Sequence, residues 1–223
     1  MGRITMKKYW RTIKGLFLKN YFKYLHNKNV KEVSKFPEFK EFKKIPRYSR
    51  DCIITCKIDG TNGLIYIDEK NNIFAGSKNR WLWGSVQDEI HTDNQGFAKW
   101  VKENKQDLLK LGKGYHYGEW MGQGIQRNYG LKEKRFYLFN VSKWGDESIR
   151  PSCCRVVPTL FKGEFTTENI LRVLENLKRC GSWAVPGYLQ PEGIVIFHVQ
   201  SGHFYKKTIV GDEKPKGASD EIK

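Results

Sequence analysis

The sequence lacks the cysteine pattern of a disulfide-stabilised or zinc-binding protein. Its few cysteines are odd in number and have no paired C-x-x-C spacing: Cys52, Cys56, Cys153, Cys154 and Cys180. This pattern excludes a disulfide framework and a structural zinc site, and it is typical of a reducing compartment. A run of about 18 apolar residues, the length of a transmembrane helix, is also missing. We therefore expect a soluble, cytoplasmic protein.

Acidic residues are missing from the start of the chain. Residues 1–31 carry nine Lys or Arg residues and no Asp or Glu. Apolar and aromatic residues recur there at helical spacing, which predicts a basic amphipathic helix in an N-terminal arm, residues 1–35. Such a helix binds nucleic acid, lies on an anionic membrane surface, docks on a partner or packs on the protein body. The sequence leaves these alternatives open.

The chain as a whole is strongly basic but has enough apolar residues for a folded core. It holds 40 Lys and Arg against 24 Asp and Glu, for a formal charge of +16, and 39% of its 223 residues are hydrophobic. The charge favours a polyanionic partner such as nucleic acid. The size suits one large domain, which we assign to residues 36–212, followed by a polar tail at 213–223. We expect a monomer.

Hydrophobic periodicity predicts more strands than helices in this domain. Helices are expected at 97–111 and 168–179, the second with Thr167 as its N-cap and Gly181 as its C-terminal stop. Apolar and alternating runs predict strands at 52–59, 64–68, 72–76, 114–120, 135–141, 193–199 and 203–210. Strands that outnumber helices in this order indicate an α+β fold with antiparallel sheets.

The stretch T-C-K-I-D-G-T-N-G-L at 55–64 places two opposite charges inside a strand signal. Because alternate strand residues share a face, Lys57 and Asp59 are expected to point one way, and Cys56 and Ile58 the other. Taken alone, the charged pair is explained equally well by a structural ion pair and by a functional site.

Charges interrupt other apolar strand signals later in the chain. These are Glu119 in G-E-W-M-G, Glu192 before G-I-V-I-F-H, and Lys206 with Lys207 in H-F-Y-K-K-T. Charges in apolar strands are costly unless they meet one another or a ligand, so we expect them to converge with Asp59 on one pocket. Carboxylates and lysines together suit a triphosphate with a divalent cation.

The order of these motifs resembles the covalent nucleotidyltransferases, which include ATP-dependent polynucleotide ligases and mRNA capping enzymes. The shared order is K-x-D-G, an aromatic-flanked glutamate, an aromatic strand, E-G-[IV]-V and a late lysine strand. K-I-D-G-T-N-G, with Asn62 five residues after Lys57, is similar to the RNA ligase branch. The resemblance implies a nucleotidyltransferase fold of class α+β, with antiparallel sheets and flanking helices around an ATP pocket.

The resemblance also implies a reaction and its cofactors. Lys57 would attack the α-phosphate of ATP to give a lysyl-AMP intermediate. AMP would then pass to a 5'-phosphate end of RNA, and a 3'-hydroxyl would displace it to seal the strand. Mg²⁺ or Mn²⁺ would assist, with Asp59 and Glu192 serving the metal and orienting the lysine.

The resemblance also implies nucleotide-binding roles for three further residues. Glu119 is implied to contact the ribose, and Phe139, in the aromatic strand F-Y-L-F-N-V, to stack on adenine. Asn62 is implied to act near the phosphates or the incoming end.

Basic residues outside the strand motifs are less sharply assigned. In A-G-S-K-N-R-W-L, either Lys78 or Arg80 is similar to the basic residue that follows the nucleophile strand in the family. Arg127, in a glycine-rich segment, is explained equally well by a phosphate ligand and by a solvated loop residue.

Three features depart from the family pattern. The family's last motif has two lysines at i and i+2, whereas Lys206 and Lys207 are adjacent and must point to opposite faces; we favour Lys206 as the pocket residue. Cys56 stands where RNA ligases often have glutamate. The sixteen residues after Lys207 leave no room for the C-terminal OB domain of DNA ligases and capping enzymes. We therefore expect a minimal RNA ligase, with a DNA nick-sealing ligase or a non-catalytic nucleic-acid-binding protein as alternatives.

Overall fold

The part of the chain that the structure describes is the predicted domain. The computed structural model describes residues 50–211 except 87, 88 and 91, together with 40–42, 44, 45 and 48. Contacts divide the chain into Met1–Ile45 and Pro46–Lys223, and all of the helices and strands described lie in the second unit. The predicted arm at 1–35 and the predicted tail at 213–223 lie outside the described residues.

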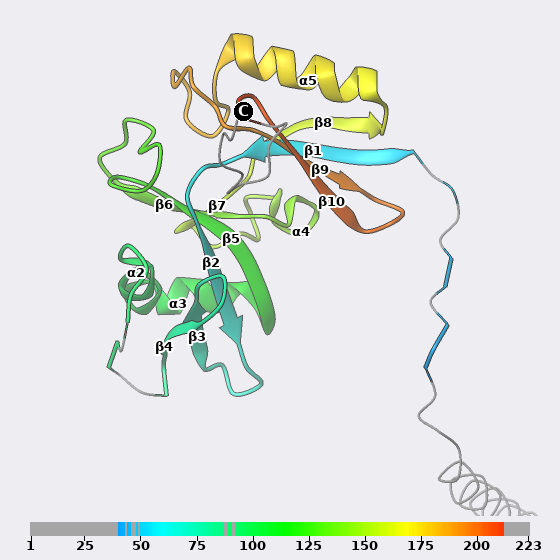
Figure 1. Ribbon diagram of the computed structural model, residues 1–223. Helices are drawn as coiled ribbons and strands as arrows, with labels where there is room; N and C mark the ends of the chain where they lie inside the picture. Colours follow the sequence, from blue (N-terminus) through cyan, green and yellow to red (C-terminus); the bar gives the residue numbers. More distant parts are fainter. Residues whose placement is uncertain are drawn as a thin grey trace, which may run out of the picture. The chain divides into compact units, whose positions relative to one another are not determined.

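One sheet has four antiparallel strands in the order β10-β9-β1-β8 (Figure 1). Its strands are β1 (Asp51–Lys57), β8 (Thr159–Glu164), β9 (Gly193–His198) and β10 (His203–Thr208). Alternate residues of β1 from Cys52 to Cys56 are buried in a core with helix α5 (Thr167–Cys180). The intervening residues, which end in Lys57, therefore face the opposite side of the sheet.

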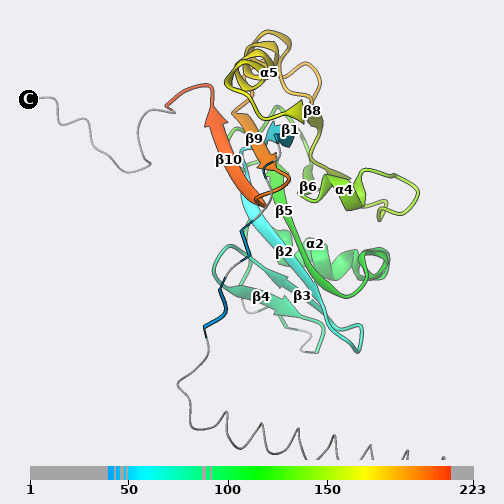
Figure 2. The same cartoon turned by 90° about the vertical axis from the view of Figure 1, so that its right-hand side faces the viewer.

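The second sheet has six strands in the order β4-β3-β2-β5-β6-β7, antiparallel except for the parallel pair of β6 and β7. Its strands are β2 (Thr61–Ile67), β3 (Ile73–Gly76), β4 (Trp81–Gly84), β5 (Gly114–Gly122), β6 (Lys134–Leu138) and β7 (Cys154–Val156). The chain passes from the first sheet to the second through the short link 58–60, between β1 and β2 (Figure 2).

Short helices cover one face of the six-stranded sheet. They are α2 (Phe97–Glu103), α3 (Lys105–Leu108) and the 3-10 turn η1 (Leu109–Leu111), while α4 (Val141–Trp144) follows β6. Phe97, Val101 and Leu108 are fully buried against alternate residues of β2 and β3. Burial of these side chains, at about 25 cal/mol per Å² of apolar surface, is what holds the helices on the sheet.

A third core cluster fixes the link between the sheets. Ile58 is buried with Met121 of β5, Tyr137 of β6 and the segment around Ala184. Tyr137 donates a hydrogen bond from its hydroxyl to the Ala184 carbonyl at 2.8 Å. The residue after Lys57 is therefore anchored in a packed interior, which limits the positions that the lysine can adopt.

The α+β class and the predicted strands are confirmed, but several strands end one to three residues earlier than predicted, and two of these ends affect the site. β1 ends at Lys57, so Asp59 lies beyond the strand and is not placed by strand alternation. β6 ends at Leu138, because Asn140 caps α4 by accepting a hydrogen bond from the Lys143 N–H. Phe139 therefore lies just after the aromatic strand rather than within it.

Helices are present at both predicted positions, but the structure differs from the prediction in two details. The predicted helix at 97–111 is broken at Asn104, whose side-chain amide donates to the Trp100 carbonyl at 2.8 Å and so competes with helix propagation. The N-cap of α5 is Thr166 rather than Thr167, and its side chain accepts from the Asn169 N–H. Gly181 is confirmed as the residue that ends this helix.

Three short strands, β4, β7 and β8, were not predicted. Each has from three to six residues and lacks a clear alternation of apolar and polar side chains. Within the described residues, no helix is both long and apolar enough to cross a membrane.

The packing of α5 gives a direct test of the fold. Leu177 is 1% exposed in the core with β1 and β9, whereas Leu171 on the same helix is 44% exposed. We expect Leu177→Ala to lower the free energy of unfolding by about 2–4 kcal/mol, and Leu171→Ala to change it by less than about 0.5 kcal/mol. Urea unfolding of both variants checks this, and equal losses would contradict the described packing.

Candidate active site

The centre of the site is an ion pair between Lys57 and Glu192. Lys57 Nζ lies 2.6 Å from Glu192 Oε2, and the two side chains are 22% and 9% exposed. The sheet register produces this contact, because Lys57 at the end of β1 lies opposite Gly193, and Glu192 directly precedes that glycine. Both side chains are mostly buried, so the ion pair lies inside the protein rather than on its surface. Lys57 also lines a cavity.

Lys57 provides the compensating charge for the buried carboxylate of Glu192. Glu192 is buried, and its Oε2 accepts no hydrogen bond of ordinary geometry from any described residue. The close contact with the ammonium group of Lys57 is therefore electrostatic. Buried carboxylates are normally paired or hydrogen-bonded, so the charge of this oxygen is compensated by Lys57.

Asp59 forms its ion pair with Arg127, whereas Lys57 pairs with Glu192. Arg127 Nε donates to Asp59 Oδ2 at 2.9 Å and its Nη1 donates to the Gln190 carbonyl at 3.2 Å. The Asp59 N–H donates to the hydroxyl oxygen of Tyr129 at 2.8 Å, and Tyr129 is buried. Lys57 and Asp59 therefore have separate partners from elsewhere in the chain. Lys57 pairs with Glu192, and Asp59 contacts Arg127 and Tyr129.

Glu119 connects the opening motif to β5. Its carboxylate accepts from the Gly60 N–H at 3.1 Å and from the side-chain amide of Asn62 at 3.3 Å. Asn62 lies directly opposite Glu119 in the pairing of β2 with β5. Burial raises the pKa of Glu119 from an ordinary value of 4.5 to about 7, and the charge of Lys57 opposes this rise. The carboxyl group is therefore poised between its two charge states near neutral pH.

A cavity that receives side chains from both sheets lies beside these residues. Lys57, Asn62 and Glu119 line it, whereas the predicted site residues Asp59, Glu192 and Lys206 are not among its lining residues. The cavity has a volume of about 330 Å³, within the range of small-ligand pockets. A larger cavity of about 650 Å³ adjoins it and shares Thr55, Phe139, Val195 and Phe204 with it. The smaller cavity is lined by Lys57, Asn62, Glu119 and Phe139 among the predicted site residues, with Thr55, Cys56, Ile58, Val157, Val195 and Phe204.

Phe139 presents its ring to both cavities and is 38% exposed. Its N–H donates to the Tyr117 carbonyl at 3.0 Å, which fixes its backbone after β6 has ended. A half-exposed aromatic ring at the wall of a pocket is a suitable surface for a planar ligand.

The glycines of the two motifs are required by close approaches of the backbone. A Cβ on Gly60 would lie 2.4 Å from the Trp120 carbonyl oxygen. A Cβ on Gly193 would lie 2.2 Å from the Lys207 carbonyl oxygen, and the φ of Gly193 is +156°. Both approaches are with rigid backbone atoms, so a side chain at either position would move Lys57 or Glu192.

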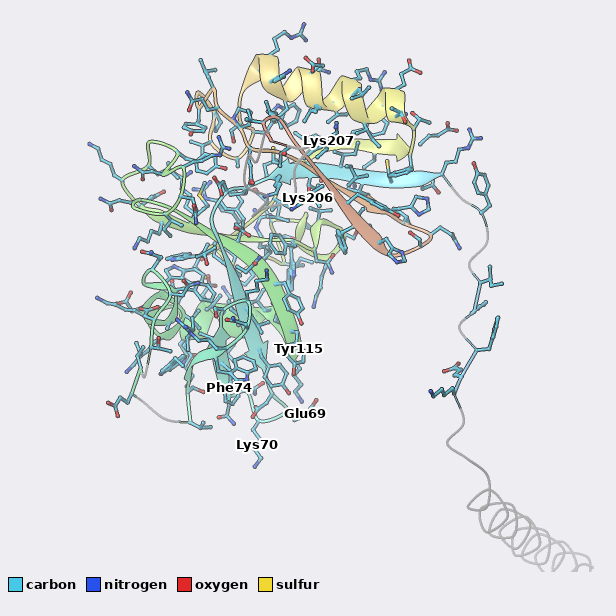
Figure 3. All side chains as sticks on the ribbon, viewed as in Figure 1. Glu69, Lys70, Phe74, Tyr115, Lys206 and Lys207 are labelled. Carbon is cyan, nitrogen blue, oxygen red and sulfur yellow. The ribbon has the colours of Figure 1, made fainter. Side chains whose placement is uncertain are left out.

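The register of β10 separates the two adjacent lysines (Figure 3). Lys206 lies opposite Val195 and on the same strand face as Phe204, two residues that line the smaller cavity. Lys207 lies opposite Ile194, which is buried in the core beneath α5. The face that meets the cavity is therefore the one that carries Lys206.

Lys78 and Arg80 lie in the turn between β3 and β4. Both side chains are exposed, and neither lines the cavity around Lys57. Leu64 pairs with Gly76, so this turn continues past β3 toward the Asn62 end of β2. The structure brings both residues to the same end of the sheet and does not distinguish between them.

Comparison with known families assigns the chain. A family model described as RNA ligase matches residues 50–208, which is most of the chain and includes every residue of the site. The chain belongs to the RNA ligase family.

Solved structures of RNA ligases share the fold of this family member. Three variants of Naegleria gruberi RNA ligase, one without ligand, one with ATP and Mn and one with AMP and Mn, match with a TM-score of 0.53 each. Their identities are 21%, 22% and 20%; 71% of this chain is covered, and 49%, 50% and 49% of theirs. The chain thus spans about half the length of these ligases. A comparison with curated proteins finds no match.

The sequence pattern did not identify two residues of this RNA ligase site. The sequence leaves two interpretations open for Arg127 and carries no signal for Tyr129. Residues 126, 128 and 129 have φ values of 44°, 59° and 53°, a left-handed path that turns both side chains toward Asp59. Such a path in residues other than glycine is uncommon and has no short sequence signature, so only the three-dimensional structure shows it.

Cys56, which replaces the glutamate that is frequent in RNA ligases, is part of the core. It is 4% exposed among the residues that pack under α5, although one side of it reaches the cavity. Burial raises the pKa of its thiol to about 11, so the thiol stays protonated. We assign it a packing role.

No three His, Cys, Asp or Glu side chains of the described residues come together in a way that could hold a metal ion alone. Asp59 and Glu192 each bring a carboxylate to the site, where Asp59 pairs with Arg127 and Glu192 pairs with Lys57. Mg²⁺ typically takes one or two carboxylates and completes its shell with phosphate oxygens and water. The residues fit a divalent cation that arrives with a nucleotide.

The raised pKa of Glu119 predicts a pH-dependent stability. Between pH 4.5 and about 7 the folded protein binds more protons at Glu119 than the unfolded chain does, so ionisation of this buried carboxyl costs stability as pH rises. Glu119→Gln removes this cost. We expect the variant to gain about 2 kcal/mol relative to the wild type between pH 5 and pH 8, or roughly 5 °C in Tm.

The measurement is thermal unfolding of both proteins at pH 5 and pH 8. Glu103→Gln, at an exposed position on α2, serves as the control and should show the same difference from wild type at both values. A Glu119→Gln difference that does not change with pH would show that Glu119 is already ionised at pH 5.

Proposed function

We propose that the chain is an ATP-dependent RNA ligase with a nucleotidyltransferase fold, and that it adenylates itself on Lys57. The observation that carries the proposal is the ion pair of Lys57 with Glu192 at 2.6 Å, at a cavity lined by Asn62, Glu119 and Phe139. Membership of the RNA ligase family supports it. Related folds that contain ATP and Mn or AMP and Mn support the choice of nucleotide and metal.

The first step would be attack of Lys57 Nζ on the α-phosphorus of ATP. A P–N bond forms, the bond from the α-phosphorus to the bridging oxygen breaks, and pyrophosphate leaves. The attacking nitrogen must first lose a proton, and Glu192, in contact with it, is the carboxylate best placed to accept that proton. Before attack, the same ion pair holds the amine at the cavity wall.

Two further transfers would complete the reaction. An oxygen of the RNA 5'-phosphate attacks the α-phosphorus, the P–N bond breaks, and Lys57 regains its amine. The 3'-hydroxyl of the other RNA end then attacks the activated 5'-phosphorus, a phosphodiester bond forms, and AMP leaves. Lys57 is thus the only covalent participant that the protein provides in this scheme.

The remaining cavity residues would hold and orient the nucleotide. Phe139 would stack on adenine and Glu119 would contact the ribose hydroxyls, while Asn62 beside it would approach the phosphates. Lys206 would neutralise phosphate charge from the β10 side, and Lys78 or Arg80 from the turn after β3. Hydrogen bonds and charges fixed before the reaction are effective because they need no reorganisation as negative charge moves.

The metal would be held by Asp59 and Glu192 together with phosphate oxygens. Bound there, it would supply positive charge to the leaving pyrophosphate. Arg127 and Tyr129 would then act by positioning Asp59, since both contact it directly.

Incubation with α-labelled ATP and Mg²⁺ or Mn²⁺ tests the proposal. We expect the wild type to retain label on a denaturing gel and Lys57→Ala to retain none. Glu192→Gln should lower labelling by about 100-fold or more, because it removes the charge that holds the lysine. Absence of label on the wild type, or label that survives Lys57→Ala, would end the mechanism. Sealing of nicked RNA compared with nicked DNA then separates an RNA ligase from the DNA ligase alternative.

The β10 register predicts different roles for the adjacent lysines. Lys206→Ala should reduce labelling by about tenfold or more, because a charge on the cavity face is lost. Lys207→Ala should change labelling by less than about threefold, because its face meets the core under α5. Rates of labelling at saturating ATP measure both, and a larger effect of Lys207→Ala would contradict the assignment.

A further inference from the structure

One face of the six-stranded sheet carries a patch of aromatic rings beside the cavity around Lys57. Two of these rings, Tyr115 and Tyr117, line the larger adjoining cavity of about 650 Å³. The rings come from four neighbouring strands, β5, β2, β3 and β4, and we refer to them as the aromatic platform: Tyr117, Tyr115, Tyr66, Phe74 and Trp81. Tyr115 is 57%, Tyr117 56% and Trp81 50% exposed. Figure 3 shows Phe74 and Tyr115 on neighbouring parts of this sheet, above the turn that holds Glu69 and Lys70.

The rings of the platform contact one another in sequence across the strands. Tyr115 stacks on Tyr66 with ring centroids 4.4 Å apart, and Tyr66 lies 6.2 Å from Trp81. Phe74 completes a triangle of rings with them, at 5.8 Å from Tyr66 and 6.0 Å from Trp81. Tyr117 extends the patch, nearly parallel to Tyr115 at 6.3 Å. The five rings therefore form one contiguous aromatic patch rather than scattered exposed rings.

The aromatic platform continues the strand faces that carry Glu119 and Asn62. On β5, Glu119, Tyr117 and Tyr115 share a face because they alternate along the strand. On β2, Asn62 lies opposite Glu119 and Tyr66 lies opposite Tyr115. The distance along β5 from Glu119 to Tyr115 is about 13 Å, which is the length of about three or four stacked nucleotides.

Basic side chains surround the platform. Lys70 lies in the turn before β3, Lys78 and Arg80 in the turn before β4, and Lys113 just before β5. Glu69 is paired with Lys113, so these two charges largely cancel. Among the described residues, the positive charge that remains at the platform edge comes from Lys70, Lys78 and Arg80. Exposed rings with a cationic edge are the combination by which proteins bind unpaired nucleic acid, with bases on the rings and phosphates on the cations.

We propose that the aromatic platform binds the unpaired bases of a single-stranded RNA next to the end that is being joined. The proposal rests on the proposed function and names its substrate class. Rings bind the faces of unstacked bases, and those faces are hidden inside a duplex. The ligase would therefore act on single-stranded RNA ends, or on ends with an unpaired segment of about three or four nucleotides, in preference to a nick in a fully paired duplex.

The test compares RNA binding by the full chain and by Tyr115→Ala, Trp81→Ala and their combination. The probes are a fluorescein-labelled single-stranded 12-mer RNA with a 5'-phosphate and a blunt RNA duplex of the same length, at one fixed salt concentration. Each substitution should weaken single-strand binding by about fivefold or more, the usual effect of removing one stacking ring, and should leave duplex binding within about twofold. Trp81→Phe should retain binding because it keeps a ring.

The matched control is Tyr205→Ala. Tyr205 is an aromatic residue of β10 that is 48% exposed and packs against Phe165, outside the platform. Its removal should leave both affinities unchanged. Self-labelling with α-labelled ATP should also be unchanged in Trp81→Ala, because Trp81 lines neither the cavity around Lys57 nor the adjoining cavity that Phe139 reaches. Trp81→Ala is therefore the variant that separates RNA binding from self-labelling.

Several results would overturn the proposal. These are single-strand binding that survives the combined substitution, an equal loss for the duplex, or an equal loss with Tyr205→Ala. The first is also the result expected if a protein partner or residues 1–39 occupy the platform. If a variant does not fold, crosslinking of a 5-iodouridine RNA to the wild type replaces it: adducts on Tyr115 or Trp81 support the proposal, and adducts confined to other segments refute it. A failure of wild-type self-labelling would count against the proposed function alone.

Discussion

The ion pair between Lys57 and Glu192 is the constraint on which the site depends. Each partner is costly to bury alone, so removal of either one leaves an uncompensated charge in a poorly hydrated place. The pair also joins two strands, since Lys57 ends β1 and Glu192 precedes β9. The pairing of β1 with β9 therefore sets the chemistry, and α5 supports that pairing through the core on its other face.

The other two carboxylates of the site, Asp59 and Glu119, have partners of their own. Arg127 neutralises Asp59, while Glu119 is left with hydrogen bonds from Gly60 and Asn62 and with a raised pKa. Three carboxylates can gather near one lysine only because their charges are compensated in these different ways. In the proposed mechanism, an incoming cation would complete the balance of charge at these carboxylates.

Much of this could be predicted from the sequence because the decisive features are local. Alternation along a strand predicted that Cys56 points away from the face of Lys57, and adjacency predicted that Lys206 and Lys207 face opposite ways. The placement of Asp59 could not be predicted in this way, because it lies after the strand and its position depends on Arg127, far along the chain. The early end of β6 depends likewise on the Asn140 cap, a choice between strand and helix that apolar periodicity does not reveal.

Strand β5 has consequences for how the family can vary. One of its faces carries Glu119 and the platform tyrosines, and the other packs Trp120 against Phe97. Insertion or deletion of a single residue inside β5 would exchange the two faces, so that an indole would enter the nucleotide cavity and a carboxylate would enter the core. A length change inside this strand would therefore disturb the cavity and the core together, unless a β-bulge absorbed it.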